Sequence, residues 1–245
     1  MDKNLVLKFD DLVVELLSKL NRFESVNDFD SNVVDPFAAA IEATVFGHKN
    51  ENEWRISELH RQKQKALMNQ IGNLQQAIIG RLPGWKSFDS GFDMPDVVGS
   101  RGRQKIIAEV KNKYNTMNSN SAAETYDKLV DFLSRDEFKG YIGVVVQIVG
   151  PLPRGVHWKP FAPGKKRVER DDLIVMGGRP FYAIATDEHE RQPVKDFKST
   201  DLIDRWKSWH AIDQMTDEMF ASISRCVGSE VPSWVRKFLN PAIGT

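Results

Sequence analysis

The amino-acid sequence predicts an α/β fold: a central mixed β-sheet flanked by helices, with a helical N-terminal part and a helical C-terminal part. Three observations lead to this class. Apolar residues recur at helical spacing through residues 1–85, short apolar strands alternate with a helix over residues 90–190, and helical spacing returns over residues 199–239. No linker-like stretch interrupts the chain, so we expect one domain spanning residues 1–245.

Three helices are expected in the N-terminal part. Residues 10–24 show helical apolar spacing, and Asp35-Pro36 opens a second helix because proline is tolerated in a first turn. A longer third helix is expected from about residue 52 to residue 81, where the sequence Leu-Pro-Gly-Trp follows. Its buried stripe is predicted to contain Leu67, Ile71, Leu74, Ile78 and Leu82.

The middle of the chain is expected to form the sheet. Strands are predicted at residues 94–98, 105–111, 141–149 and 181–186. The first two would pair as a hairpin around a turn at residues 99–103, and a helix over residues 121–135 would follow. Residues 150–179 contain several prolines and basic side chains and are interpreted as a basic loop. The C-terminal residues 199–239 are expected to form two or three helices.

Composition narrows the functional classes. The chain has 34 basic and 34 acidic residues, whereas proteins that coat nucleic acid without sequence preference carry a large positive excess. It has no apolar run long enough to span a membrane, no secretory signal pattern and a single cysteine, Cys226, which predict a cytoplasmic protein without disulfides or membrane contact. It also lacks a glycine-rich phosphate loop, so we expect no nucleotide cofactor.

Three polar residues stand out in the predicted hairpin. Glu109 and Lys111 are two residues apart in one strand, so their side chains point the same way, about 7 Å apart along the chain. Asp96, which follows Pro95, would lie beside them on the neighbouring strand. We therefore expect two carboxylates and one ammonium group to converge at one edge of the sheet.

This combination suits phosphodiester hydrolysis. Mg²⁺ prefers hard oxygen ligands, which Asp96, Glu109 and the backbone carbonyl of Val110 would supply. The ion would polarise the phosphate and lower the pKa of a bound water. Lys111 would either orient that water or neutralise charge that grows on the phosphate, and the sequence leaves these two roles open.

A structural explanation competes with this interpretation. Acid-x-Lys triplets are common as surface charge, and the chain contains two more, at Glu137-Phe-Lys139 and Asp196-Phe-Lys198. Only the triplet at Glu109 lies on a predicted apolar strand and has a Pro-Asp pair at hairpin distance. A buried acid costs free energy unless it is paired or binds a metal, which favours the functional interpretation for this triplet.

The Pro-Asp pair, the spacer and the Glu-Val-Lys triplet resemble the PD-(D/E)XK nuclease superfamily. The continuation Asn-Lys-Tyr-Asn-Thr-Met-Asn, followed by Thr125-Tyr-Asp-Lys-Leu129 on a helix, resembles the type II restriction endonucleases that cut palindromes of the GGNCC kind. The similar segment covers residues 95–129. The resemblance implies a restriction-endonuclease-like core, a catalytic set of Asp96, Glu109 and Lys111, and Mg²⁺-dependent cleavage of double-stranded DNA by a homodimer that leaves 5′-phosphates.

Polar and basic side chains near this segment are candidates for binding DNA. After the catalytic strand, the candidates are Lys113, Asn115, Thr116 and Asn118, which would otherwise belong to a solvated loop. In and after the basic loop, they are Arg154, His157, Lys159, Lys165, Lys166, Arg167 and Arg179. Further from the motif, Glu42, Glu58 and His60 are interpreted as helix surface residues.

Two other functions compete with a restriction enzyme. The same scaffold could serve a repair or structure-selective nuclease, whose cleavage follows a nick, a junction or a mismatch. It could also serve a DNA-binding module without catalysis, although an intact set of acids argues against a retired site.

Overall fold

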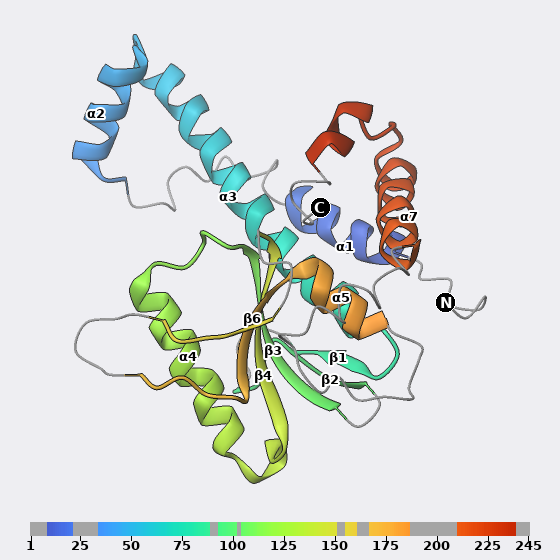
Figure 1. Ribbon diagram of the computed structural model, residues 1–245. Helices are drawn as coiled ribbons and strands as arrows, with labels where there is room; N and C mark the ends of the chain where they lie inside the picture. Colours follow the sequence, from blue (N-terminus) through green and yellow to red (C-terminus); the bar gives the residue numbers. More distant parts are fainter. Residues whose placement is uncertain are drawn as a thin grey trace.

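The computed structural model describes residues 9–21, 34–88, 93–101, 104–150, 155–160, 167–186 and 210–238. Within them, a mixed six-stranded sheet has helices on both faces (Figure 1), which confirms the predicted class. Its helices are α1 (Asp10–Asn21), α2 (Pro36–Phe46), α3 (Glu51–Gly80), α4 (Ser119–Ser134), α5 (Gly178–Thr186) and α7 (His210–Val227), with short 3₁₀ helices η2 (Asp136–Phe138) and η3 (Ser233–Phe238). Its strands are β1 (Trp85–Ser87), β2 (Val97–Arg101), β3 (Gln104–Lys113), β4 (Tyr141–Val149), β5 (Val156–His157) and β6 (Leu173–Gly177).

The strands follow the order β1-β2-β3-β4-β6-β5 across the sheet. The pairs β1–β2, β2–β3 and β5–β6 are antiparallel, whereas β3, β4 and β6 run parallel to one another. Residues 106–110 of β3 and 143–148 of β4 are buried, as expected of strands covered on both faces. The predicted hairpin of the two strands before α4 is confirmed.

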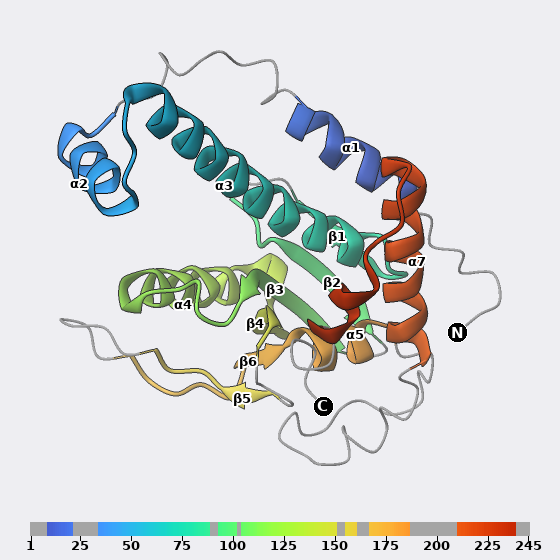
Figure 2. The ribbon, with the colours of Figure 1, turned by 90° about the horizontal axis from the view of Figure 1, so that it is seen from above.

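Two layers of helices cover the sheet (Figures 1 and 2). On one face, α1, α3 and α5 contribute apolar side chains to a core that includes Ile106, Ala108 and Val110 of β3. On the other face, α4 packs against Ile107 and its neighbours. Because side chains alternate along a strand, Glu109 belongs to the α4 face.

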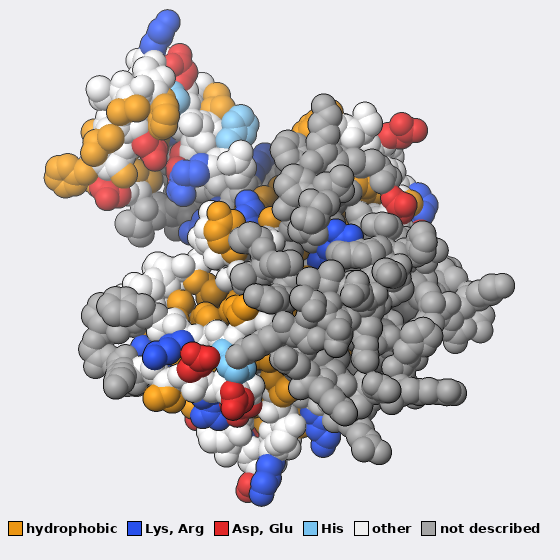
Figure 3. Space-filling view, in the orientation of Figure 1, with side chains coloured by type: hydrophobic (Ala, Val, Ile, Leu, Met, Phe, Trp, Pro, Cys, Tyr) orange, Lys and Arg blue, Asp and Glu red, His pale blue; other side chains and the backbone are white. Residues whose placement is uncertain are grey.

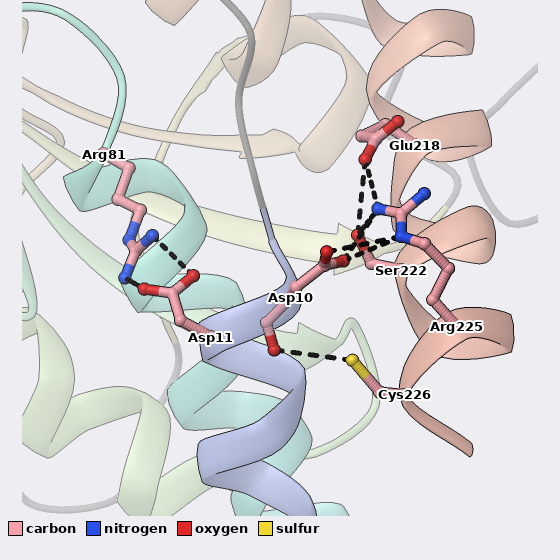
Figure 4. A network of polar contacts seen from close by, with 7 residues as sticks. All are labelled: Asp10, Asp11, Arg81, Glu218, Ser222, Arg225 and Cys226. Atoms are coloured by element: carbon pink, nitrogen blue, oxygen red, sulfur yellow. Dashed lines mark hydrogen bonds and ion pairs between the residues drawn. The ribbon is translucent and has the colours of Figure 1, made fainter. Parts of the chain in front are cut away.

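Polar contacts join α1 to helix α7 and to the end of helix α3 (Figure 4). Arg225 of α7 donates to the Asp10 carboxylate at 2.7 Å, and Arg81, after α3, pairs with Asp11. The thiol of Cys226 lies 3.6 Å from the carbonyl oxygen of Asp10. Exposed ion pairs contribute about 1 kcal/mol at most, so these contacts orient α1 more than they stabilise the fold.

One predicted strand is wrong. Residues 181–186 belong to helix α5, and the strand of this region is β6, which ends one residue before α5 begins. The sequence Phe-Tyr-Ala-Ile-Ala-Thr is short and apolar, so its pattern does not distinguish a strand from a buried helix. A buried strand and a buried helix would both place these apolar side chains in the core. As part of α5, this segment also makes a polar contact: the Tyr182 hydroxyl donates to Gln75 of α3 at 2.8 Å.

Smaller differences concern element boundaries. Strand β2 begins at Val97 and includes Gly99 and Arg101, so the predicted turn at residues 99–103 is shorter than expected. Strands β1, β5 and β6 were not predicted, since each is short and lies next to proline- or glycine-containing turns. In α3, only the end of the predicted stripe is buried, at Ile78 and Leu82. Leu67, Ile71 and Leu74 are half-buried, and Leu74 packs against the core at its edge.

Substituting Gly99 tests the close packing at the start of the sheet. Gly99 is paired with Trp85, and a Cβ atom at Gly99 would lie less than 3.0 Å from three atoms of that indole ring. We expect Gly99→Ala to lower the free energy of unfolding by about 1–3 kcal/mol in urea titrations, because overpacking forces the ring to move.

Gly72 provides the matched control. It lies in α3, and a Cβ atom added there would meet nothing within 4 Å, so Gly72→Ala should raise stability by about 0.5–1 kcal/mol through helix propensity. Equal effects of the two substitutions would contradict the packing argument.

Candidate active site

The pairing of β2 with β3 brings the predicted site residues together. Val97 is registered with Ala108, which places Asp96, just before β2, opposite Glu109. Residues opposite one another on antiparallel strands share a face, and Lys111 shares it because it is two residues after Glu109. The three side chains predicted from the sequence therefore gather on the α4 face, toward the carboxyl ends of β3 and β4.

Glu109 is the buried acid of this group. Its side chain is 3% exposed, and its two carboxylate oxygens face different ammonium groups. Lys128 of α4 donates to Oε1 at 2.6 Å, and the Nζ of Lys111 lies 3.5 Å from Oε2. A carboxylate at this depth would be costly if unpaired, so both lysines stabilise its charged form.

Asp96 is held by the backbone of the neighbouring strand. Its Oδ2 accepts a hydrogen bond from the amide of Val110 at 2.8 Å. Burial raises the pKa of the Asp96 carboxyl, and the charge of Glu109 raises it further, against the opposing effects of the Val110 amide and the two lysines. Two adjacent carboxylates thus repel each other, and a cation between them would relieve that repulsion.

The donor set fits a hard divalent cation. Asp96 and Glu109 offer carboxylate oxygens. In a strand, the amide and carbonyl of one residue point to the same side, so the Val110 carbonyl faces the side on which Asp96 accepts the Val110 amide. Carboxylate and carbonyl oxygens are the protein ligands that Mg²⁺ commonly uses together with water.

Lys128 was not assigned a role from the sequence, although it lies in the segment that resembles restriction enzymes. Helix α4 begins at an Asn118 cap, whose side chain accepts from the amide of Ser121 at 2.9 Å. The buried residues Leu129 and Phe132 face the sheet, and Lys128 borders them with its ammonium 5.5 Å from the Phe132 ring. Helical periodicity alone places Lys128 at the edge of the buried face of α4. At such a position the ammonium group can point either to solvent or to the site.

Gln147 is a second residue that sequence analysis did not single out. It lies on β4, registered with Lys111 of β3, and is 9% exposed. Its amide belongs to the same face of the sheet as the three site residues. A polar residue within the apolar run of residues 141–149 is the signal that could have identified it.

The candidate DNA contacts after β3 lie at the carboxyl edge of the sheet. Lys113, Asn115, Thr116 and Asn118 are all exposed there. Thr116 donates its hydroxyl to the carbonyl of Lys113 at 2.8 Å, and Asn118 caps α4. Two of the four side chains therefore support the turn between β3 and α4, and contact with DNA stays a prediction for all of them.

The basic loop is described in part, and Arg154, Lys165 and Lys166 lie outside the described residues. Lys159 is exposed, while His157 of β5 lies 3.1 Å from Glu169. Arg179 is in the first turn of α5, and this helix lies on the face of the sheet opposite α4 (Figure 1). These positions bring the candidates to different parts of the surface, and their contacts with DNA stay predictions.

Arg167 pairs with an acid of helix α4, and its contact with DNA stays a prediction. Its guanidinium donates to both carboxylate oxygens of Asp127 on α4, at 3.1 and 2.7 Å, and the residue is buried. Beside it, the Tyr126 hydroxyl donates to the carbonyl of Val168 at 2.5 Å. As placed, Arg167 attaches the loop to α4, and a role in DNA contact would require it to leave this pair.

Glu42 and Glu58 make contacts within the helical N-terminal part. Glu42 of α2 accepts from the indole of Trp54 at 3.3 Å. Glu58 pairs with Arg61, whose hydrogen bond lowers the pKa of the Glu58 carboxyl, and also accepts from Gln62. Both carboxylates therefore have partners on α3. Among the residues that the structure describes, no helix is long and apolar enough to cross a membrane.

Comparison with known proteins identifies the family. The family model described as Eco47II restriction endonuclease matches residues 2–193. The chain is 33% identical over 192 residues to the type II restriction enzyme Eco47II of Escherichia coli, covering 76% of this chain and 77% of that enzyme. It is 25% identical over 190 residues to the type II restriction enzyme Sau96I of Staphylococcus aureus, covering 73% and 70% of the two chains. The chain therefore belongs to the Eco47II restriction endonuclease family and is a type II restriction enzyme.

Proposed function

We propose that this enzyme cleaves double-stranded DNA at a short GC-rich palindrome as a homodimer, using Mg²⁺ at Asp96, Glu109 and the Val110 carbonyl and leaving 5′-phosphates. The observation that carries the proposal is the adjacency of Asp96 to the buried Glu109, with Lys111 on the same face. The two relatives, both named as type II restriction enzymes, support sequence-specific cleavage. The palindrome of the GGNCC kind rests on the resemblance of residues 95–129.

Each side chain has a distinct part in this mechanism. Bound Mg²⁺ would supply a Lewis acid for the phosphate and a more acidic water. Asp96 and Glu109 hold the cation site, and the Val110 amide fixes the orientation of Asp96. Lys111 lies close enough to Glu109 to remain at the site, where it either orients the attacking water or neutralises the charge that develops on the phosphate.

Lys128 is proposed as a counter-charge for Glu109 in the metal-free enzyme. It forms the shorter of the two ammonium contacts to this carboxylate, at 2.6 Å against 3.5 Å for Lys111. A cation that binds Glu109 would compete with this ion pair and free the Lys128 ammonium. Because 43% of the Lys128 side chain is exposed, the ammonium can turn toward solvent or toward a DNA phosphate.

Digestion of a plasmid tests the proposed function. Purified enzyme with Mg²⁺ should give discrete fragments whose sequenced ends share one palindrome, one cut position and a 5′-phosphate. Cleavage that follows nicks, junctions or mismatches instead would assign the enzyme to structure-selective nucleases. No cleavage of any duplex with Mg²⁺ or Mn²⁺ would reject the proposal.

Replacing Glu109 separates catalysis from binding. Glu109→Gln should lower the single-turnover cleavage rate by about a hundredfold to a thousandfold or more, because one metal ligand loses its charge. DNA affinity measured in Ca²⁺ should change by a few-fold only. The matched control is Glu137→Gln, in an exposed acid-x-Lys triplet of the same spacing, which should cleave normally. Equal rates for the two variants would place the chemistry elsewhere.

Replacing Lys128 tests its competition with the cation. In metal-free buffer, Lys128→Met should lower the melting temperature by about 2–4 °C, since the buried Glu109 loses its nearer partner. Added Ca²⁺ should then stabilise the variant more than it stabilises the wild type. Lys139→Met, which removes an exposed lysine, is the control. An unchanged response to Ca²⁺ in Lys128→Met would show that Lys128 does not compete for the site.

A further inference from the structure

The N-terminal helices form an arm that extends from the sheet. We define the arm as residues 34–66, which comprise α2 and the first half of α3. In Figures 1 and 2, α2 stands away from the sheet on the side where α4 begins, and it packs against α3. None of the eleven residues of α2 is buried.

The composition of α2 does not match this exposure. Its sequence, Pro-Phe-Ala-Ala-Ala-Ile-Glu-Ala-Thr-Val-Phe, contains a single charged residue, Glu42, and apolar side chains occur all around the helix. A helix that is apolar on every side is normally buried. Here its large side chains are exposed, at 79% for Phe37, 64% for Ile41, 69% for Val45 and 70% for Phe46. Figure 3 shows hydrophobic side chains gathered over the arm.

The size of this surface points to an interface. Together with Ile56 of α3, which is 50% exposed, these side chains present roughly 600 Å² of mainly apolar surface. The largest apolar patch of a typical monomer is about 300–600 Å², and a stable interface takes about 800 Å² from each partner. The arm therefore supplies most of the surface that one subunit of a dimer needs.

The near absence of charge on α2 indicates the kind of partner that would cover this helix. The described part of α2 has no lysine or arginine that could meet a phosphate, and the Glu42 carboxylate already accepts from Trp54 at 3.3 Å. A surface depleted in charge is typical of permanent homodimers, whereas transient partners meet at surfaces about as polar as the rest of the protein. A duplex with two-fold symmetry also calls for two copies of its reader.

We propose that the arms of two chains pair with each other, α2 and α3 of one copy against α2 and α3 of the other, and hold the enzyme as a homodimer. The choice of a second copy as the partner rests on the proposed function. The exposed apolar surface is observed independently of that function. Ile41 lies one helical turn from both Phe37 and Val45, which places it in the middle of the exposed ridge. The paired arms would lie on the side of each molecule where α4 begins (Figure 2).

Sedimentation velocity on the full-length enzyme without DNA tests this proposal. Wild type at micromolar concentration should sediment with twice the chain mass of 27.9 kDa. Ile41→Glu should raise the dimer dissociation constant at least about a hundredfold, because a charge would be buried at the centre of the interface. The circular dichroism spectrum and the thermal unfolding of Ile41→Glu should remain those of a folded protein.

Val227→Glu is the matched control, since Val227 is an apolar residue of α7 that is 52% exposed outside the arm. It should leave the dimer intact. The milder Ile41→Ala adds no charge and should raise the dissociation constant about tenfold. A wild type with the mass of one chain, a dimer that survives Ile41→Glu, or dissociation by Val227→Glu would each overturn the proposal.

The experiment also separates the interface from the proposed function, because sedimentation does not depend on cleavage. A dimer sensitive to Ile41→Glu that cuts no DNA would keep the interface and reject the proposed cleavage. A monomer that cuts a palindrome would keep the proposed cleavage and reject the interface.

Discussion

The burial of one carboxylate governs the arrangement around the candidate site. Glu109 lies in β3, one of the two central strands of the sheet, and is 3% exposed, so an unpaired charge there would be strongly destabilising. Three parts of the chain surround this carboxylate: β3 places Lys111 on the same face, α4 supplies Lys128, and Asp96 lies opposite it, just before β2. The two lysines balance the two carboxylates in formal charge, so a divalent cation would leave the site with a net positive charge for a phosphate.

Helix α4 connects this site to the basic loop. The two residues that precede Lys128 contact other parts of the chain: Asp127 binds Arg167 with both oxygens, and Tyr126 donates to the carbonyl of Val168. Consecutive residues of one helix therefore contact the buried acid and the loop that precedes β6. A displacement of the loop by DNA would act on α4 and, through Lys128, on the contact to Glu109. This arrangement gives a physical route by which DNA binding and the geometry of the site can influence each other.

The sequence predicted the elements whose patterns are long or chemically distinctive. Thirty residues of helical spacing identified α3, nine consecutive residues of apolar strand identified β4, and Asp35-Pro36 marked the start of α2. The adjacency of Asp96 and Glu109 followed from a hairpin, which is a local structure. By contrast, residues 181–186 were predicted as a strand although they belong to helix α5, and the neighbouring strand β6 was not predicted. Both segments are short and apolar, so only tertiary packing distinguishes the strand in the sheet from the helix that covers it. Lys128 could not be assigned from periodicity, since its contact with Glu109 depends on how α4 lies across the sheet.

The distribution of charge over the molecule reconciles a net charge of zero with a protein that acts on a polyanion. Acids occupy positions that need them: Glu109 and Asp96 at the site, Asp127 against Arg167, and Asp10 against Arg225. These acids are thereby paired within the protein, whereas Lys159 and Lys113 are exposed, where they would be able to meet phosphate oxygens. Helix α2 has almost no charge of either sign and large exposed apolar side chains. Charge therefore separates three kinds of surface: a buried site that would bind a cation, basic positions that would face DNA, and an apolar arm that would face another copy of the chain.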